Sequence, residues 1–213
     1  MKKLAALIMC VILSSFALFA EESKAKEIFT NFGEPLKEKG GNIIVNAGVG
    51  VDIYVINPLS WSWYIPPVVV SGEYTVKCGP VPLGFGLEAG FTGYRNIVNY
   101  NYIPVDGAVY QETIFNHNLF VAALVNYHIN LPVKGLDVYA GPRVGVNLNF
   151  VKNEQTVYNG HKGKLENKTV NEFTPSLYYG GAIGASWYFS NLLGANLELG
   201  YPIFAKASVS LKF

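Results

Sequence analysis

Ionisable residues are sparse along most of this chain, and their positions limit the chemistry they could perform. Asp52, Glu73, Glu88, Arg143 and Glu198 each occupy a polar position in a stretch that alternates between polar and apolar residues. Alternate residues of a strand share a face, so these charges are predicted on the polar faces of strands. A charge held away from water needs a partner. We therefore expect Arg143 to bind one or more of the glutamates in a structural network, with a proton or ion path, or a gated pore, as the functional alternative.

Histidine and serine could together support nucleophilic catalysis. His117 stands in "FNHNLF" with no serine beside it, so a serine and an orienting carboxylate would have to approach from elsewhere in the chain. The candidates are Ser60, Ser62 and Ser176 for the hydroxyl, and Glu112 and Glu172 for the carboxylate. A single interfacial histidine is more often a polar rim residue, so no catalytic residue is predicted.

Metal and phosphate sites have no support in the residue spacing. The histidines at 117, 128 and 161 are scattered, and the single cysteine beyond the first 20 residues, Cys78, has no metal-ligand spacing to them. The glycine-rich stretches "GFGLEAG" and "GGAIGAS" do not join a strand to a helix, as a phosphate-binding loop requires. We expect no metal and no other cofactor.

The start of the chain has the pattern of an export signal. Two lysines, the apolar stretch 4–19 and Ala20 precede the acidic "EES", which predicts a signal peptide over 1–20, with an uncleaved anchor as the alternative. Residues 21–41 hold many charges and are predicted to be a polar periplasmic leader. After removal of the signal, 14 basic residues face 15 acidic ones, a balance that argues against nucleic acid as a partner.

From Asn42 onward the dominant period is two, which predicts strands. Eight alternating segments are expected: 42–54, 68–78, 84–93, 115–129, 136–150, 177–189, 193–201 and a last one that begins after Pro202 and ends at Phe213. Long loops are predicted at 55–67, 93–114 and 151–176, and short turns at 79–83, 130–135 and 190–192. Long loops at one end and tight turns at the other are typical of an outer-membrane barrel.

The apolar faces are predicted to meet lipid. The strands hold far fewer charges than a soluble surface would, which disfavours the alternative of a secreted lipocalin-like barrel with its apolar face inside. Aromatic residues recur near both ends of the apolar faces, as at the two membrane interfaces. One set comprises Phe85, Tyr127, Trp187, Phe189 and Phe213, and the other comprises Phe91, Phe115, Phe150, Tyr179 and Tyr201. In the last strand the odd positions, Ile203 among them, are expected to face lipid.

Residues 42–213, with their eight alternating segments and their terminal "ASVSLKF", resemble the small outer-membrane barrels of the OmpA-barrel, OmpX and OmpW type. The resemblance implies an all-β fold, a closed antiparallel up-and-down transmembrane barrel of eight strands in the bacterial outer membrane. It also implies that the last strand and Phe213 form the signal read by the barrel-assembly machinery. Outer-membrane lipid is then the surrounding partner, and a monomer is expected.

The resemblance leaves the function open between three classes. The first is a non-catalytic barrel with a structural or surface-interaction role, which could bind an extracellular ligand at its loops. The loop residues that suggest such contacts are Trp61, Trp63, Tyr64, Lys162, Lys164 and Lys168. The second is a narrow OmpW-like channel for small apolar solutes, and the third is a lipid A-modifying enzyme that uses His117.

Overall fold

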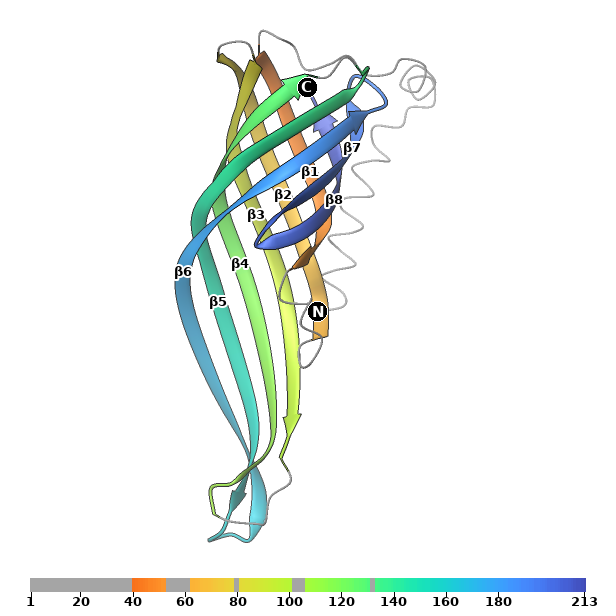
Figure 1. The fold of residues 1–213 in the computed structure, drawn as a ribbon. Coiled ribbons are helices and arrows are strands. Elements are labelled where there is room, and N and C mark those ends of the chain that lie inside the picture. Colours follow the sequence, from red (N-terminus) through yellow and green to blue (C-terminus); the bar gives the residue numbers. More distant parts are fainter. Residues whose placement is uncertain (1–39, 53–61, 79–80, 101–105, 131–132) are drawn as a thin grey trace.

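A computed structural model describes residues 40–52, 62–78, 81–100, 106–130 and 133–213. Eight antiparallel strands follow one another around a closed barrel, and β8 returns to pair with β1 (Figure 1). The strands are β1 (Gly40–Asp52), β2 (Ser62–Cys78), β3 (Val81–Asn99), β4 (Val109–Asn130), β5 (Leu136–Asn159), β6 (Lys164–Tyr188), β7 (Leu193–Tyr201) and β8 (Ile203–Lys212). The predicted fold class is confirmed. No helix among the described residues is long and apolar enough to cross a membrane.

The two faces of the strands follow the predicted alternation. Large apolar side chains such as Ile183, Leu177 and Leu197 are 66%, 68% and 67% exposed on the outer wall. Polar and charged side chains, together with Tyr139 and Tyr188, are buried inside. An apolar exterior and a polar interior suit a barrel whose solvent is the acyl region of a membrane.

Closure between the first and last strands reaches the final residue of the chain. The backbone N–H of Ile43 donates to the carbonyl of Phe213 at 3.0 Å, and the N–H of Phe213 donates to the carbonyl of Ile43 at 2.8 Å. These bonds satisfy backbone groups that would otherwise form an open edge in lipid. The aromatic ring of Phe213 faces outward and is 56% exposed.

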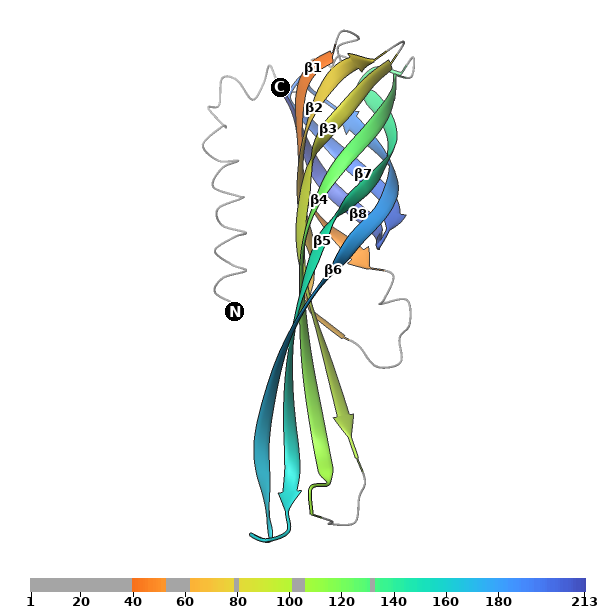
Figure 2. The same cartoon turned by 90° about the vertical axis from the view of Figure 1, so that its left-hand side faces the viewer.

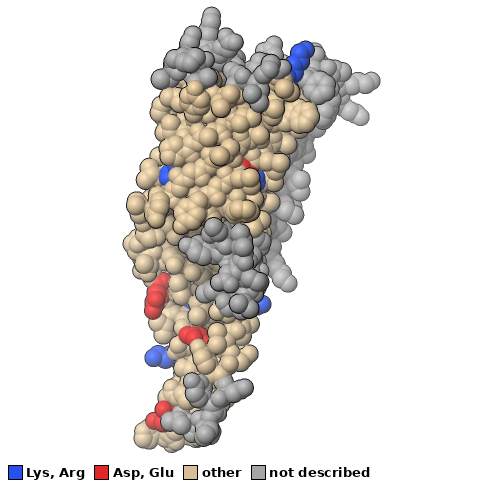
Figure 3. Space-filling view, viewed as in Figure 1, with Lys and Arg blue, Asp and Glu red and all other residues tan. Residues whose placement is uncertain are grey.

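Four strands continue far beyond the closed part of the barrel. β3, β4, β5 and β6 extend together as one sheet, which we call the projecting sheet, whereas β7 and β8 turn back early (Figures 1 and 2). In the view of Figure 3 the charged side chains gather mainly on the projecting sheet, and the barrel wall shows few. The pairing of β5 with β6 runs without a break from Leu136 opposite Trp187 to Asn159 opposite Lys164.

The prediction of long loops at 93–114 and 151–176 is therefore wrong for most of their length. Residues up to Asn99 belong to β3, those from Val109 to β4, and a turn at 160–163 separates β5 from β6. Outside the membrane both faces of a strand meet water, so the alternation that marks a lipid-facing strand is not required there. The polar composition of these segments, without alternation, therefore predicted loops.

Three further expectations involve residues that lie partly or wholly outside the described ranges. The signal peptide over 1–20 and nearly all of the leader over 21–41 lie outside the described residues, and β1 begins two residues earlier than predicted, at Gly40. Trp61 lies outside the described residues. β2 begins at Ser62 and includes Trp63 and Tyr64, which the sequence had placed in a loop, although their side chains are not described.

Candidate functional site in the lumen and at the outer rim

Four charged side chains from four strands meet in the lumen. The Lys206 ammonium lies 2.8 Å from Glu88 Oε2 and 2.9 Å from Glu198 Oε1. The Arg143 guanidinium donates from one terminal nitrogen to Glu198 Oε2 at 3.0 Å, and its Nε lies 3.7 Å from Glu88 Oε1. All four side chains are buried, and two cations match two carboxylates. Such pairing is what allows charges to remain in a site largely removed from water.

A second group of polar side chains continues this charge cluster along the lumen. Asn126 accepts a hydrogen bond from Arg143 at 3.1 Å and donates one to Glu73 at 2.7 Å. His128 Nδ1 lies 2.9 Å from Asp137 Oδ2, and its Nε2 lies 3.5 Å from Glu73 Oε2. The amide of Asn126 thus links the Arg143 cluster to a buried Glu73–His128–Asp137 group.

Two tyrosines lie across the lumen among these charges. The Tyr139 hydroxyl donates to Glu198 Oε2 at 2.8 Å and accepts from the Asn196 amide at 2.9 Å. A Cβ atom at Gly184 would lie 2.3 Å from the Tyr139 ring, so any larger residue would clash with the ring in its present position. Tyr188 shares a hydrogen bond of 3.0 Å with Ser210 nearer the short turns.

An apolar layer covers the charge cluster on the side of the projecting sheet. Val69, Phe120, Ala122 and Tyr178 are buried together, and the Phe120 and Tyr178 rings stack 4.4 Å apart with an interplanar angle of 3°. We call this group the aromatic lid. An eight-stranded barrel is only wide enough for side chains to fill. The aromatic lid, the charge cluster and the two tyrosines are all buried inside it here.

Of the five residues predicted for the lumen network, three lie in the charge cluster, one is joined to it and one has no described side chain. Glu88, Arg143 and Glu198 lie in the charge cluster, and Glu73 is joined to it through Asn126. Asp52 is in β1, but its side chain lies outside what the structure describes. Lys206 was missed as a member, although its polar position in the last strand was visible in the sequence. His128 and Asp137 were missed too, and no local pattern links them.

The predicted interface aromatics lie next to the short turns. Phe85, Tyr127, Trp187 and Phe213 are each about half exposed on the outer wall, and Phe189 is half-buried after the end of β6. At the opposite end of the outer wall, Phe150 and Phe173 lie with ring centroids 5.0 Å apart. The placement of the first set, and of Phe150 from the second set beside Phe173, suits rings at the two membrane interfaces.

His117 lies on the outer rim, and among the described side chains of its groove a carboxylate is present but a serine is not. Its ring stacks on Phe91 at 6.0 Å, and it lines a shallow groove with Phe150, Lys152 and Glu172. Within the described residues no serine lines this groove, and Ser176 lines a different cavity. Ser60 is not described, and neither is the side chain of Ser62.

Glu112, the other carboxylate considered for His117, is engaged elsewhere. It accepts hydrogen bonds from Asn153, from Gln155 at 3.1 Å and from the Tyr100 hydroxyl at 3.1 Å. In the part of the chain that the structure describes, no cluster of three or more His, Cys, Asp or Glu side chains could hold a metal ion.

A closed barrel with an apolar exterior and a charge-paired interior defines a transmembrane barrel of the bacterial outer membrane. The chain belongs to the outer membrane protein beta-barrel domain family, whose model matches residues 67–205. Its location is therefore the outer membrane. No curated protein matches the chain.

Three solved barrels are similar to this chain in fold, all at low sequence identity. The N-terminal β-barrel domain of Pseudomonas aeruginosa OprF is 13% identical with a TM-score of 0.41, over 82% of this chain and 99% of that one. Ail, the attachment invasion locus protein of Yersinia pestis, is 10% identical with a TM-score of 0.40, over 81% and 99%. Neisserial surface protein A is 13% identical with a TM-score of 0.32, over 80% and 94%.

Proposed function

We propose that this protein is a non-catalytic surface-interaction barrel, in which the closed part anchors the projecting sheet outside the cell. The observation that supports this most is the mismatch in strand length. β6 pairs with β5 over its whole length, but β7 pairs with β6 only between Gly181 and Tyr188. A barrel that served only to fill the membrane would not need strands that continue beyond it.

The mismatch leaves one side of β6 open. Among the described residues, those at 164–177 pair with β5 alone, so their outward N–H and C=O groups are available to another strand. An extended segment of a partner protein can add to such an edge through main-chain hydrogen bonds. We infer that the partner presents an extended polypeptide segment to this edge.

The side chains of the edge are compatible with this role. Lys164, Glu166 and Lys168 introduce charges of both signs, which discourage pairing between two copies of the same edge. Pro175 lacks an N–H and is tolerated where its nitrogen faces an open edge. Residues at even spacing from Pro175 direct their N–H groups the same way in a regular strand.

The other two function classes receive less support. A channel needs an open path, whereas the buried side chains of the aromatic lid and the charge cluster lie across the lumen. A lipid A-modifying enzyme needs a nucleophile near His117, and the groove at His117 contains no described serine. A purely structural role would be served equally well without the projecting sheet.

The test uses a phage-displayed library of extended peptides, selected on the full protein in lipid nanodiscs. We expect the selected peptides to lose binding to a Thr169→Pro, Asn171→Pro double variant, which removes two outward N–H groups of the edge. The matched control, Thr169→Ala with Asn171→Ala, keeps the backbone donors and should keep binding. Equal binding to both variants, or no selectable peptide, would contradict the proposal.

A further inference from the structure

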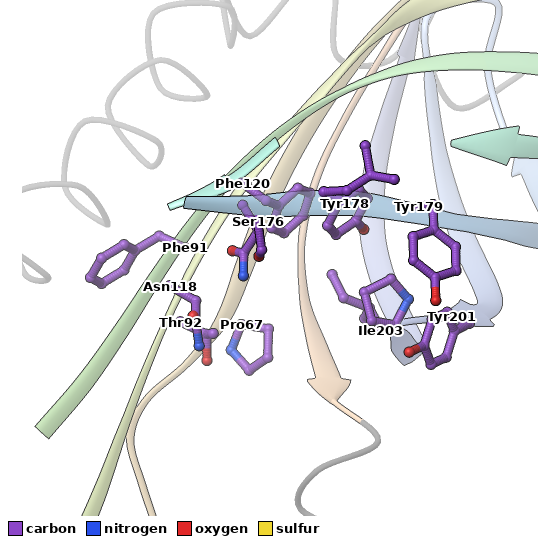
Figure 4. A pocket seen from close by; sticks show the side chains of 13 residues that line it. Pro67, Phe91, Thr92, Asn118, Phe120, Ser176, Tyr178, Tyr179, Tyr201 and Ile203 are labelled. Carbon is purple, nitrogen blue, oxygen red and sulfur yellow. The ribbon is translucent and has the colours of Figure 1, made fainter. Parts of the chain in front are cut away.

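A cavity of about 160 Å³ lies at the outer mouth of the barrel, on the side of the aromatic lid that faces the projecting sheet (Figure 4). Its lining comes from β2, β3, β4, β5 and β6 and from the junction of β7 and β8, at Tyr201, Pro202 and Ile203. The charge cluster lies on the other side of the lid, because Glu88 is two residues along β3 from Gly90, which pairs with Phe120. The cavity is therefore closed toward the periplasm.

The barrel wall is open beside this cavity. β7 and β8 meet at Tyr201–Ile203, while β6 continues outward without a neighbour on that side among the described residues. Residues from both faces of β6 line the cavity, with Tyr178 from the lumen side and Leu177 and Tyr179 from the outer wall. Leu177 and Tyr179 are 68% and 61% exposed. The cavity thus joins the lumen to the membrane-facing surface.

A β-bulge at the start of β8 shapes the cavity wall. Ala205 pairs with Val51 and Ile203 pairs with Asp52, so Phe204 is the extra residue. The bulge turns Ile203 against the aromatic lid and leaves Phe204 exposed on the outside. The expectation that Ile203 faces lipid is therefore wrong, because a single inserted residue reverses the alternation. Bulges of this kind often redirect a side chain at a functional position.

The lining divides into an apolar and a polar side. Phe120, Tyr178, Ile203 and Pro67 present rings and an alkyl chain. The polar side chains come from neighbouring strands in register, since Thr92 pairs with Asn118 and Asn147 pairs with Ser176. The Thr92 hydroxyl donates to the Ile65 carbonyl at 3.3 Å, which leaves the amides and Ser176 to meet a ligand.

We propose that this cavity is a binding site for a single aromatic ring that bears one hydrogen-bonding group, such as a phenol, reached from the outer leaflet. A cavity of about 150 Å³ lined by apolar side chains is known to hold benzene, so the volume suits one ring. The ring would contact the aromatic lid and Ile203, and its hydroxyl would meet Asn118 or Asn147. A whole acyl chain exceeds this volume, and the polar side disfavours its methylenes. The closed floor makes this a binding site and not a route across the membrane.

The test follows isoleucine methyl resonances of the full protein in lipid nanodiscs during titration with 4-methylphenol. We expect the Ile203 methyl to shift along a saturable curve. The methyl of Ile183, which is 66% exposed to lipid, should shift only linearly as the phenol partitions into the bilayer. Toluene, which lacks the hydroxyl, should bind at least tenfold more weakly at Ile203. A linear response of Ile203, or equal binding of toluene, would overturn the proposal.

Three variants localise the effect. Ser176→Phe fills the mouth and should abolish the saturable shift, whereas Thr174→Phe, two residues further out on the same face of β6, should leave it intact. Asn118→Leu with Asn147→Leu should weaken 4-methylphenol at least tenfold without weakening toluene. Unchanged binding to Ser176→Phe would place the ligand elsewhere and overturn the proposal. Broadening of the Ile203 methyl resonance by spin-labelled lipid that 4-methylphenol cannot reverse would assign the cavity to an acyl chain and overturn the proposal.

Discussion

Lys206 and Glu88 are 118 residues apart in the chain and form a buried ion pair of 2.8 Å across the lumen. The same ammonium also contacts Glu198 at 2.9 Å, so one side chain of the last strand neutralises carboxylates from β3 and β7. Formation of these contacts requires that β8 has closed the barrel against β1. The charge cluster is therefore a property of the completed barrel.

Removal of the Lys206 charge should destabilise the barrel strongly. In Lys206→Met only Arg143 remains to balance the carboxylates of Glu88 and Glu198, and breaking a buried pair in this way costs about 3–5 kcal/mol. Urea unfolding in detergent micelles measures the change. Lys168→Met, a control in the projecting sheet, should change the free energy of unfolding by less than about 0.5 kcal/mol. Equal stability of the two variants would show that the lumen is hydrated enough to leave its charges unpaired.

The closed lumen should conduct no sustained ionic current. In planar bilayers we expect no open channel from the unchanged protein, because side chains from several strands fill the interior. Arg143→Ser with Lys206→Ser removes both cations of the charge cluster and leaves the two carboxylates. That variant should admit cations in preference to anions, provided that gel mobility shows a folded barrel. A steady current through the unchanged protein would favour the channel alternative.

Gly184 should not tolerate a side chain. A Cβ there would lie 2.3 Å from the Tyr139 ring, whose hydroxyl bonds Glu198 and Asn196. Gly184→Val should lower the free energy of unfolding by about 1–3 kcal/mol through overpacking. The neighbouring Ala185 faces the outer wall, so Ala185→Val should change the free energy of unfolding by less than about 0.5 kcal/mol. Thermal unfolding in the same detergent compares the two.

The projecting sheet should loosen in acid through Glu112. Hydrogen bonds from Asn153, Gln155 and Tyr100 hold the pKa of Glu112 below its ordinary value of 4.5. A carboxyl with a lowered pKa in the folded sheet stabilises it above that ordinary value, and the contribution disappears as the pH falls through the lowered pKa. The loss should be about 1 kcal/mol, given the partial exposure of the side chain. Hydrogen exchange at β4 and β5 amides, corrected for intrinsic rates, measures it below pH 4.5.

Glu112→Gln provides the control for the acid effect. The variant has no carboxyl to titrate, so protection in β4 and β5 should be lower at neutral pH and should respond less to acid. An acid response identical to that of the unchanged protein would assign the titration to another carboxylate.

Assembly in cells should depend on Phe213. We propose that its exposed ring, at the end of the strand that closes the barrel, is read by the barrel-assembly machinery. Phe213→Ala should reduce the amount of folded barrel in the outer membrane several-fold. Refolding into detergent, where no machinery is present, should change little because the bonds to Ile43 use the backbone. Equal losses in both settings would indicate a stability effect alone.

The sequence by itself determined the strands and their faces within the membrane. A spanning strand has lipid on one side and the polar interior on the other, which imposes a period of two on its residues. That period can be read from a short stretch of the sequence. The same parity predicted that Glu88, Arg143 and Glu198 would face inward. It also placed Lys206 on the polar face, where its role could have been recognised.

Only the tertiary structure decided the length of the strands and the partners of the buried charges. Outside the membrane no apolar solvent imposes the period, so residues 151–176 looked like a loop although nearly all of them are paired strands. The bulge at Phe204 depends on how β8 meets β1, and it turned Ile203 inward. Lys206 meets Glu88 because closure of the barrel brings β8 and β3 to face each other across the lumen. Such contacts arise from three-dimensional closure and have no counterpart in the spacing of residues along the chain.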